Sequence, residues 1–222
     1  MDLPERDGEA SVATGGGHYF TDDPTVGSRP STVRLTLPDL SIELHTDRGV
    51  FSAERIDPGT KILLMELPEL PAGAVVDVGC GYGAISTTLA LRRPGQPIWA
   101  VDVNGRALDL TRKNLKHHAS VDTPVHVLRP EDIPDDLRVT AIVSNPPIRV
   151  GKAALHELLE FWLDRLEPNG EAWLVIQKHL GADSLAKWLT GLGFEIERVR
   201  SRQGYRLFRV THRAAEPGGS AT

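Results

Sequence analysis

Residues 75–83 read Val-Val-Asp-Val-Gly-Cys-Gly-Tyr-Gly, a short apolar run that leads into a turn with glycine at alternate positions. An apolar run of this length is typical of a β-strand that is buried on both faces. Glycine lets the backbone adopt conformations closed to other residues and lie close to a ligand. A helix beginning near Ala84 would direct its free N–H groups at the same place. The segment therefore predicts a binding site at the carboxyl end of a buried strand.

Further short apolar runs follow this segment and alternate with stretches of helical periodicity. The runs lie at residues 98–101, 125–128, 141–143 and 172–176. Apolar residues spaced three and four apart form two helical stripes, one from Leu155 to Leu166 and one from Leu185 to Leu192. Strands that alternate with amphipathic helices predict an α/β fold with a doubly wound, mostly parallel sheet of seven strands.

Antiparallel strand pairs are expected at both ends of this sheet-forming region. Residues 33–37 and 42–46 alternate apolar and polar side chains on either side of Pro38-Asp39, which predicts an N-terminal β-hairpin. Residues 194–200 and 205–210 flank a turn that contains Gly204 and predict a C-terminal antiparallel pair.

Composition predicts one domain with a tail at each end. Residues 1–17 are rich in Gly, Asp and Glu, and we expect them, like residues 214–222, to be disordered. Residues 18–213 are expected to form a single domain, with 18–52 as its hairpin extension. No apolar run approaches the roughly 18 residues that span a bilayer, and the polar amino terminus does not resemble a signal peptide. The single cysteine fits a reducing compartment, so we expect a cytoplasmic protein without a membrane partner.

The glycine turn and the strand after it have the features of a nucleoside-binding site. The spacing is Asp77-x-Gly79-x-Gly81-x-Gly83, which differs from the Gly-x-Gly-x-x-Gly of dinucleotide sites, and no Gly-Lys-Ser/Thr follows to bind a triphosphate. Asp102 ends the next strand, where a carboxylate can accept hydrogen bonds from both ribose hydroxyls. The helix end would accept a carboxylate as well as a phosphate.

Other residues near these two strand ends are placed in the same site. Val103 follows Asp102, and Cys80 is a small residue within the turn rather than a nucleophile, since no histidine or basic residue adjoins it. Glu131 and Asp132 follow the third strand, where either carboxylate could meet an adenine amine or simply face solvent. No metal site is predicted.

A second motif, Ser144-Asn145-Pro146-Pro147, follows the fourth strand. The two prolines stiffen the loop and restrict the residue before each of them. The amide oxygen of Asn145 and the carbonyl of Pro146 could then both accept hydrogen bonds from one exocyclic amine. A neutral aromatic amine is not activated by simple deprotonation, so catalysis must depend on positioning and polarisation. The motif predicts a site for the amine that accepts a methyl group. It lies beside the nucleoside-binding site, which would hold the methyl donor, so the two motifs together predict methyl transfer to nitrogen.

These motifs resemble those of the class I S-adenosylmethionine-dependent methyltransferases. The likeness is greatest to the small-domain enzymes related to the ribosomal RNA guanine-N2 methyltransferases, and it covers about residues 18–211. Segments that carry it include residues 18–20, 49–52, 145–152 and 173–178. It implies that S-adenosylmethionine binds at Gly79, Gly81, Gly83 and Asp102, that Asp77 supports the loop, and that Asn145 and Pro146 hold the target amine. It does not extend to the duplicated amino-terminal domain of the larger guanine-N2 enzymes, so target recognition is expected to differ.

The substrate is less well defined by the sequence than the cofactor is. Many amine methyltransferases have Tyr or Phe after Asn-Pro-Pro, whereas Ile148 here cannot stack on a base. Arg149 and Lys152 flank the loop and could contact RNA phosphates, as could arginines at 198, 200, 202, 206 and 209 unless these are ordinary solvated charges. The net charge of −5 is weak evidence against RNA binding.

Three hypotheses follow from these observations. The favoured one is a methyltransferase that acts on the exocyclic amine of guanine in RNA, with ribosomal RNA as its partner. The second is a methyltransferase for a protein or small-molecule amine, and the third is a non-catalytic subunit that keeps the fold to bind a partner. The intact glycine turn, Asp102 and Asn145 argue against the third. The oligomeric state is not predicted.

Overall fold

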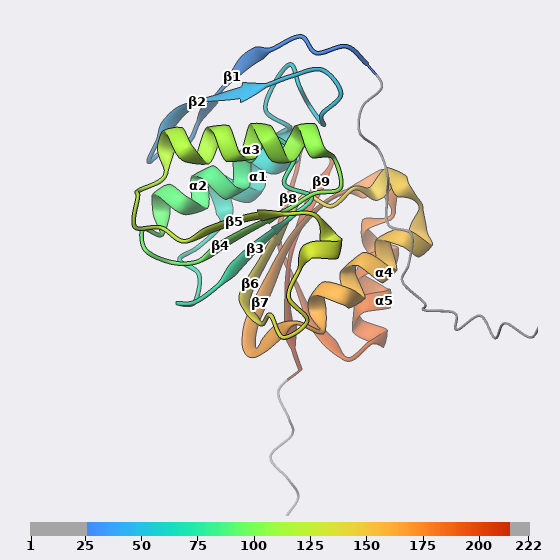
Figure 1. Ribbon diagram of the computed structural model, residues 1–222. Helices are drawn as coiled ribbons and strands as arrows, with labels where there is room; N and C mark the ends of the chain where they lie inside the picture. Colours follow the sequence, from blue (N-terminus) through green and yellow to red (C-terminus); the bar gives the residue numbers. More distant parts are fainter. Residues whose placement is uncertain (1–25, 214–222) are drawn as a thin grey trace, which may run out of the picture.

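A seven-stranded sheet forms the centre of the computed structural model, which describes residues 26–213 (Figure 1). The expectations for residues 1–17, 18–20 and 214–222 fall outside the described residues. The strand order is β5-β4-β3-β6-β7-β9-β8. The first five strands of this order run parallel. β9 is antiparallel to both of its neighbours, β7 and β8, so it alone runs against the other six strands. The predicted doubly wound fold with an antiparallel C-terminal pair is confirmed.

Each apolar run of the sequence lies in a strand, and both apolar stripes lie mainly in helices. The central strands are β3 (Val75–Val78), β4 (Ile98–Val101), β5 (Val125–Leu128), β6 (Val139–Ser144) and β7 (Leu166–Gln177), followed by β8 (Phe194–Arg202) and β9 (Tyr205–His212). The helices are α1 (Pro58–Glu66), α2 (Ala84–Arg92), α3 (Gly105–His118), α4 (Lys152–Leu163) and α5 (Ala182–Gly191), with short 3-10 turns η1 (Pro130–Asp132), η2 (Ile148–Val150) and η3 (Lys178–Leu180).

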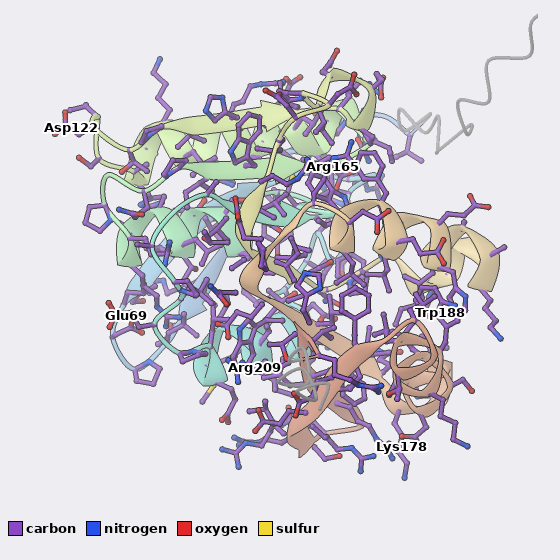
Figure 2. The ribbon with its side chains drawn as sticks, turned by 90° about the horizontal axis from the view of Figure 1, so that it is seen from below. Glu69, Asp122, Arg165, Lys178, Trp188 and Arg209 are labelled. Carbon is purple, nitrogen blue, oxygen red and sulfur yellow. The ribbon has the colours of Figure 1, made fainter. Side chains whose placement is uncertain are left out.

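The helices cover both faces of the sheet, as Figure 1 shows: α1, α2 and α3 lie on one face, and α4 and α5 lie on the other. Side chains alternate between the two faces along each strand. Val75, Val143 and Val175 therefore belong to the core under α1 and α2, whereas Val76, Ile142 and Leu174 belong to the core under α4 and α5. Figure 2 shows Asp122, which precedes β5, and Trp188 of α5 at opposite sides of the molecule.

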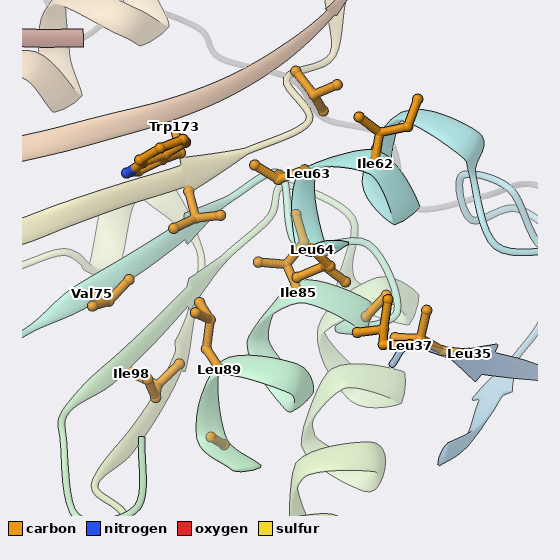
Figure 3. Close-up of a cluster of buried hydrophobic side chains, with 14 of the residues drawn as sticks. Leu35, Leu37, Ile62, Leu63, Leu64, Val75, Ile85, Leu89, Ile98 and Trp173 are labelled. Carbon is orange, nitrogen blue, oxygen red and sulfur yellow. The ribbon is translucent and has the colours of Figure 1, made fainter. Parts of the chain in front are cut away.

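The N-terminal hairpin packs on the helical layer instead of joining the central sheet. β1 (Ser31–Thr36) and β2 (Ser41–Thr46) form a separate two-stranded antiparallel sheet. Leu35 and Leu37 enter the same apolar cluster as α1, α2 and Trp173 of β7 (Figure 3). On the other strand, the backbone of His45 is hydrogen-bonded at both its N–H and its carbonyl by the Asn114 side chain of α3. The hairpin therefore extends the core outward over one helical layer.

The last apolar residue of each predicted stripe lies beyond the end of its helix. The stripe from Leu155 to Leu166 stops at Leu163, and Leu166 begins β7, because Pro168 follows and cannot continue a helix. Leu192 lies one residue beyond α5 and is 44% exposed. The helix ends there because Gly193 adopts a left-handed φ of 95°. In the sequence, apolar residues continue at helical spacing beyond the ends of both α4 and α5.

Candidate active site

A cleft of about 1060 Å³ opens at the carboxyl ends of the parallel strands. It lies where the chain changes direction in the sheet, between β3 and its neighbour β6. Ligands in open α/β sheets bind at this switch point, because the loops from the two strands diverge there. The volume is at the upper end of that of ordinary ligand sites, about 300–1,000 Å³, and allows two ligands to lie side by side.

The glycine turn after β3 forms one wall of the cleft. Gly79, Gly81 and Gly83 all have positive φ angles, of 74°, 55° and 82°, which explains the repeated glycine. The N–H of Gly81 donates to Oδ2 of Asp102 at 2.8 Å, and the N–H of Asn104 donates to Oδ1 at 2.9 Å. A carboxylate offers about four acceptor positions, so Asp102 is held firmly and still has capacity for two hydroxyl donors. Burial raises the pKa of this carboxyl group.

Asp77 lies beneath the glycine turn and is completely buried. Its Oδ2 accepts hydrogen bonds from the N–H of Ser86 at 2.9 Å and from the Ser86 hydroxyl at 2.5 Å, which ties β3 to α2. Within the described part of the chain, Oδ1 has no hydrogen-bond partner. Burial raises the pKa of Asp77 to about 7, and the nearby charge of Asp102 acts in the same direction.

The acceptor loop after β6 faces the glycine turn directly. Pro147 has φ −73° and ψ 76°, the geometry of an inverse γ-turn, and the N–H of Ile148 donates to the carbonyl of Pro146 at 2.8 Å. A Cβ atom added to Gly79 would lie 3.5 Å from Cδ of Pro147. The two loops are thus in van der Waals reach, and a ligand on one is adjacent to a ligand on the other.

The side chain of Asn145 is held in one orientation by α1. Its Nδ2 donates to Oδ1 of Asp57 at 2.8 Å and to the hydroxyl oxygen of Thr60 at 3.0 Å. A carboxylate only accepts, so the nitrogen of the amide must face α1 and the oxygen, Oδ1, must face away from it. Asp57 is also the N-cap of α1, accepting from the N–H of Thr60 at 3.0 Å.

The same Asp57 carboxylate connects to two further side chains. The hydroxyl of Tyr205 on β9 donates to Oδ2 of Asp57 at 3.3 Å, and Nε2 of Gln177, at the end of β7, donates to that hydroxyl oxygen at 2.8 Å. Burial raises the pKa of Tyr205, so it remains a donor at neutral pH. We call Asn145, Asp57, Tyr205 and Gln177 the amide relay.

Most of the predicted site residues line this one cleft. The lining includes Gly79, Gly81, Asp102, Val103, Glu131, Asn145, Pro146, Pro147, Ile148 and Arg149. Five others do not: Asp77, Cys80, Gly83, Asp132 and Lys152.

Asp77 lies beneath the glycine turn, and Cys80 lines a smaller pocket that adjoins the cleft at Gly79, Gly81 and Asn145. Cys80 is buried beside Thr111, and burial raises the pKa of its thiol well above its usual value, so the expectation that it is no nucleophile agrees with its surroundings. Gly83 packs so closely on Thr111 that a Cβ atom would lie 2.9 Å from its hydroxyl. Asp132 and Lys152 are exposed.

The sequence analysis missed several residues that belong to the site. The motifs in the sequence did not place Asp57, Gln177 or Tyr205 in the site. Only Gln177 had a local signal: it ends β7 two residues after the buried Val175, so strand alternation would place both on one face of the sheet. Phe51 and Arg55, from the loop before α1, also line the cleft, and Phe51 is 63% exposed.

The arginines near the carboxyl end are mostly paired with acidic side chains. Arg200 lies 2.7 Å from Glu66, Arg209 lies 2.6 Å from Glu171, and both Arg198 and Arg206 contact Asp183. These pairs favour the interpretation of solvated or structural charge over that of an RNA-binding patch.

Comparison with known proteins agrees with this geometry. Residues 41–209 match the methyltransferase small domain family. An uncharacterized protein of Bacillus subtilis, YbxB, is 34% identical over 87% of this chain and 97% of its own length. The ribosomal RNA small subunit methyltransferase C of Shewanella amazonensis is 33% identical over 80% of this chain and 52% of its own length.

Solved structures show the same fold. The T. thermophilus 16S rRNA N2 methyltransferase RsmC, in complex with AdoMet and guanosine, superposes with a TM-score of 0.70 at 24% identity, over 87% of this chain and 53% of that one. The chain spans about half the length of the ribosomal RNA methyltransferases it matches.

The chain belongs to the methyltransferase small domain family. It is an S-adenosylmethionine-dependent methyltransferase, and the predicted class and cofactor are confirmed. The site fits that cofactor, since the glycine turn admits a close ligand and Asp102 keeps free acceptor capacity beside it in the same cleft. No helix among residues 26–213 is both long and apolar enough to cross a membrane.

Proposed function

We propose that this methyltransferase acts on N2 of a guanine in ribosomal RNA. The observation that carries the proposal is the orientation of Asn145, whose amide nitrogen is bound by Asp57 and Thr60 so that its oxygen is left for an amine donor. Homologues named for ribosomal RNA methylation, and a fold neighbour solved with guanosine, support the choice of substrate.

The cofactor half of the cleft is proposed to consist of Gly79, Gly81, Asp102, Val103 and Glu131. Asp102 would accept hydrogen bonds from the ribose, Val103 would contact the adenine, and Glu131 would meet the adenine amine from η1. Asp77 would act from beneath the turn by tying it to α2. S-adenosylmethionine, when bound, supplies an electrophilic methyl group.

The acceptor half holds the amine instead of deprotonating it. The lone pair of an exocyclic guanine nitrogen is delocalised into the ring, so the amine is a poor nucleophile until it is positioned and polarised. Oδ1 of Asn145 and the carbonyl of Pro146 would accept its two N–H bonds and raise electron density on nitrogen. Because both acceptors sit on a loop stiffened by Pro147, little reorganisation is needed. Transfer of the methyl group would form an N–C bond, break the C–S bond of the cofactor and leave S-adenosylhomocysteine, and the nitrogen would lose one proton to water.

Other cleft residues are proposed to hold the base and the strand. Phe51 offers the exposed aromatic face that Ile148 lacks, and stacking on a base contributes about 1–3 kcal/mol. Arg55, from the loop before α1, and Arg149, in η2, both line the cleft and would contact phosphates. Lys152, one turn away and outside the cleft lining, would contribute a more distant phosphate contact.

The direct test is to incubate the purified protein and S-adenosylmethionine with protein-free 16S RNA, with small ribosomal subunits and with ribosomal proteins. Mass spectrometry of the digested nucleosides is expected to show N2-methylguanosine. A methylated base other than guanine would reject the guanine assignment. Methylated amino acids without methylated nucleosides would favour the protein-directed alternative. Cofactor binding without any transfer would favour the non-catalytic one.

A further inference from the structure

The amide relay determines the orientation of a second amide, that of Gln177, as well as that of Asn145. The carboxylate of Asp57 can only accept, so the Tyr205 hydroxyl must use its single proton to donate to Oδ2. The hydroxyl oxygen is then an acceptor, and it is Nε2 of Gln177 that donates to it at 2.8 Å. The oxygen of the Gln177 amide, Oε1, is consequently turned away from Tyr205.

Both amides lie at the same edge and on the same face of the sheet. β6 and β7 are neighbouring parallel strands that end at Ser144 and Gln177, and Asn145 and Gln177 both line the cleft. Gln177 is partly exposed, and within the described residues no hydrogen bond is made by its Oε1. Among the described residues, the relay therefore leaves two amide oxygens without protein partners beside the acceptor loop, whereas each amide nitrogen already donates within the relay.

We infer that Gln177 is a specificity-determining residue, which accepts a hydrogen bond from N1–H of guanine while Asn145 accepts one from the C2 amine. This inference rests on the proposed function. Guanine carries adjacent donors at N1 and N2 on its Watson–Crick edge. Adenine and cytosine instead have an acceptor ring nitrogen beside their amine. If Oδ1 of Asn145 bound that amine, Oε1 of Gln177 would face the lone pair of the ring nitrogen and could not form a hydrogen bond. Asp57 and Tyr205 are positioning residues, because they prevent either amide from flipping.

Locked acceptors discriminate more strongly than free amides do. A glutamine that could rotate would offer its nitrogen to an acceptor base and lose the distinction. A site that leaves buried polar groups unpaired with the wrong ligand rejects that ligand by a large factor, whereas shape alone gives a small one. The carboxylate at the centre of the relay is what removes the freedom to rotate.

The test uses nucleoside binding, which does not depend on methyl transfer. The protein is saturated with S-adenosylhomocysteine, and NMR titration measures affinities for guanosine, inosine and 2,6-diaminopurine riboside. Inosine keeps N1–H but lacks the C2 amine, whereas 2,6-diaminopurine keeps that amine but has a lone pair at N1. Wild type is expected to bind guanosine at least about 10-fold more tightly than 2,6-diaminopurine riboside.

Variants of Gln177 and of its neighbours test whether Gln177 itself selects the base. Gln177→Leu is expected to weaken guanosine and inosine about 10-fold and to leave 2,6-diaminopurine riboside unchanged or tighter. Gln177→Glu keeps an acceptor and should retain the guanosine preference, and Tyr205→Phe should reduce it by freeing the amide. Lys178→Ala, at the exposed neighbouring position, is the matched control and should preserve the ratio.

The outcomes distinguish this inference from the proposed function. If N2-methylguanosine forms but Gln177→Leu leaves the ratio of guanosine to 2,6-diaminopurine affinity unchanged, Gln177 is not the selecting residue. A wild type without nucleoside preference would overturn the inference in the same way. If no guanine is methylated on any substrate, the proposed function fails and the inference fails with it.

Discussion

The neighbours of Asn145 determine which end of its side-chain amide faces the substrate. An isolated asparagine amide can present either end to a ligand. Here Asp57 and Thr60 take both hydrogen-bonding positions of the nitrogen, which leaves the oxygen for the substrate. The stiff loop on which it sits places that oxygen next to the glycine turn.

Asn145→Ala should reduce kcat by on the order of 10²-fold or more, as expected for a group that polarises the acceptor in the transition state. The measurement is single-turnover transfer from radiolabelled S-adenosylmethionine. Calorimetry provides the control, because cofactor affinity should stay near that of wild type. A variant that turns over normally would remove Asn145 from the reaction.

Asp77 makes folding stability depend on pH. Its folded pKa, about 7, lies above that of an unfolded aspartate, so the stabilising protonated form is retained at low pH and stability is lost as pH rises through about 7. Asp77→Asn keeps an acceptor for Ser86 but cannot ionise. Between pH 5 and pH 8 its free energy of unfolding should rise by about 2–3 kcal/mol relative to wild type. Urea unfolding at several pH values measures this, and parallel profiles would contradict it.

At the scale of elements, the first turn of α1 connects the acceptor loop after β6 to β9. Asp57 caps the helix and also binds Asn145 of the β6 loop and Tyr205 of β9. The helix passes so close to β9 that a Cβ atom at Gly59 would lie 2.5 Å from the Tyr205 ring. A small residue at this position is therefore required by packing between elements and not by the helix itself.

Gly59→Ala should destabilise the fold by about 1–3 kcal/mol, since overpacking outweighs the better helix propensity of alanine. It should also lower kcat by displacing Tyr205 from Asp57. The matched control is Gly191→Ala at the end of α5, where an added Cβ meets nothing within 4 Å and stability should stay equal or increase. Urea unfolding of both variants decides the point, and equal effects at the two positions would refute the packing argument.

At the scale of the whole molecule, the net charge and the positions of the arginines determine how RNA could bind. The net charge is −5, so long-range attraction does not bring RNA to this protein. The paired arginines of β8 and β9 lie outside the cleft lining, whereas Arg55 and Arg149 are part of it. RNA binding through phosphates should therefore depend on these two cleft arginines.

Arg55→Gln and Arg149→Gln should each weaken RNA binding across sequences and lower its salt dependence by roughly one unit of slope. Filter binding of RNA at several salt concentrations measures the slope. Arg200→Gln is the control, because this side chain already pairs with Glu66 and should contribute little. If the control lowers the slope as much as the cleft variants do, the charged face lies along β8 and β9 instead.

The local patterns of the sequence were sufficient for the sheet, its helices and the two loops of the site. Buried strands require continuous apolar runs, a tight turn requires glycine, and a stiff loop requires proline. Each of these features can therefore be recognised from a few consecutive residues. The glycine turn, Asp102 and Asn145 were found in this way, and the structure brings all three to one cleft. The end of α4 at Leu163 was misplaced, because apolar spacing continues past it to Leu166.

The amide relay could be recognised only in the tertiary structure. Asp57, Asn145, Gln177 and Tyr205 are separated by as many as 148 positions, and no local pattern relates them. Hydrogen bonds between side chains depend on which strands become neighbours, here β6, β7 and β9 beside α1. Sequence determines which residue types stand at strand ends. Folding decides which of them meet, and therefore which end of an amide faces the substrate.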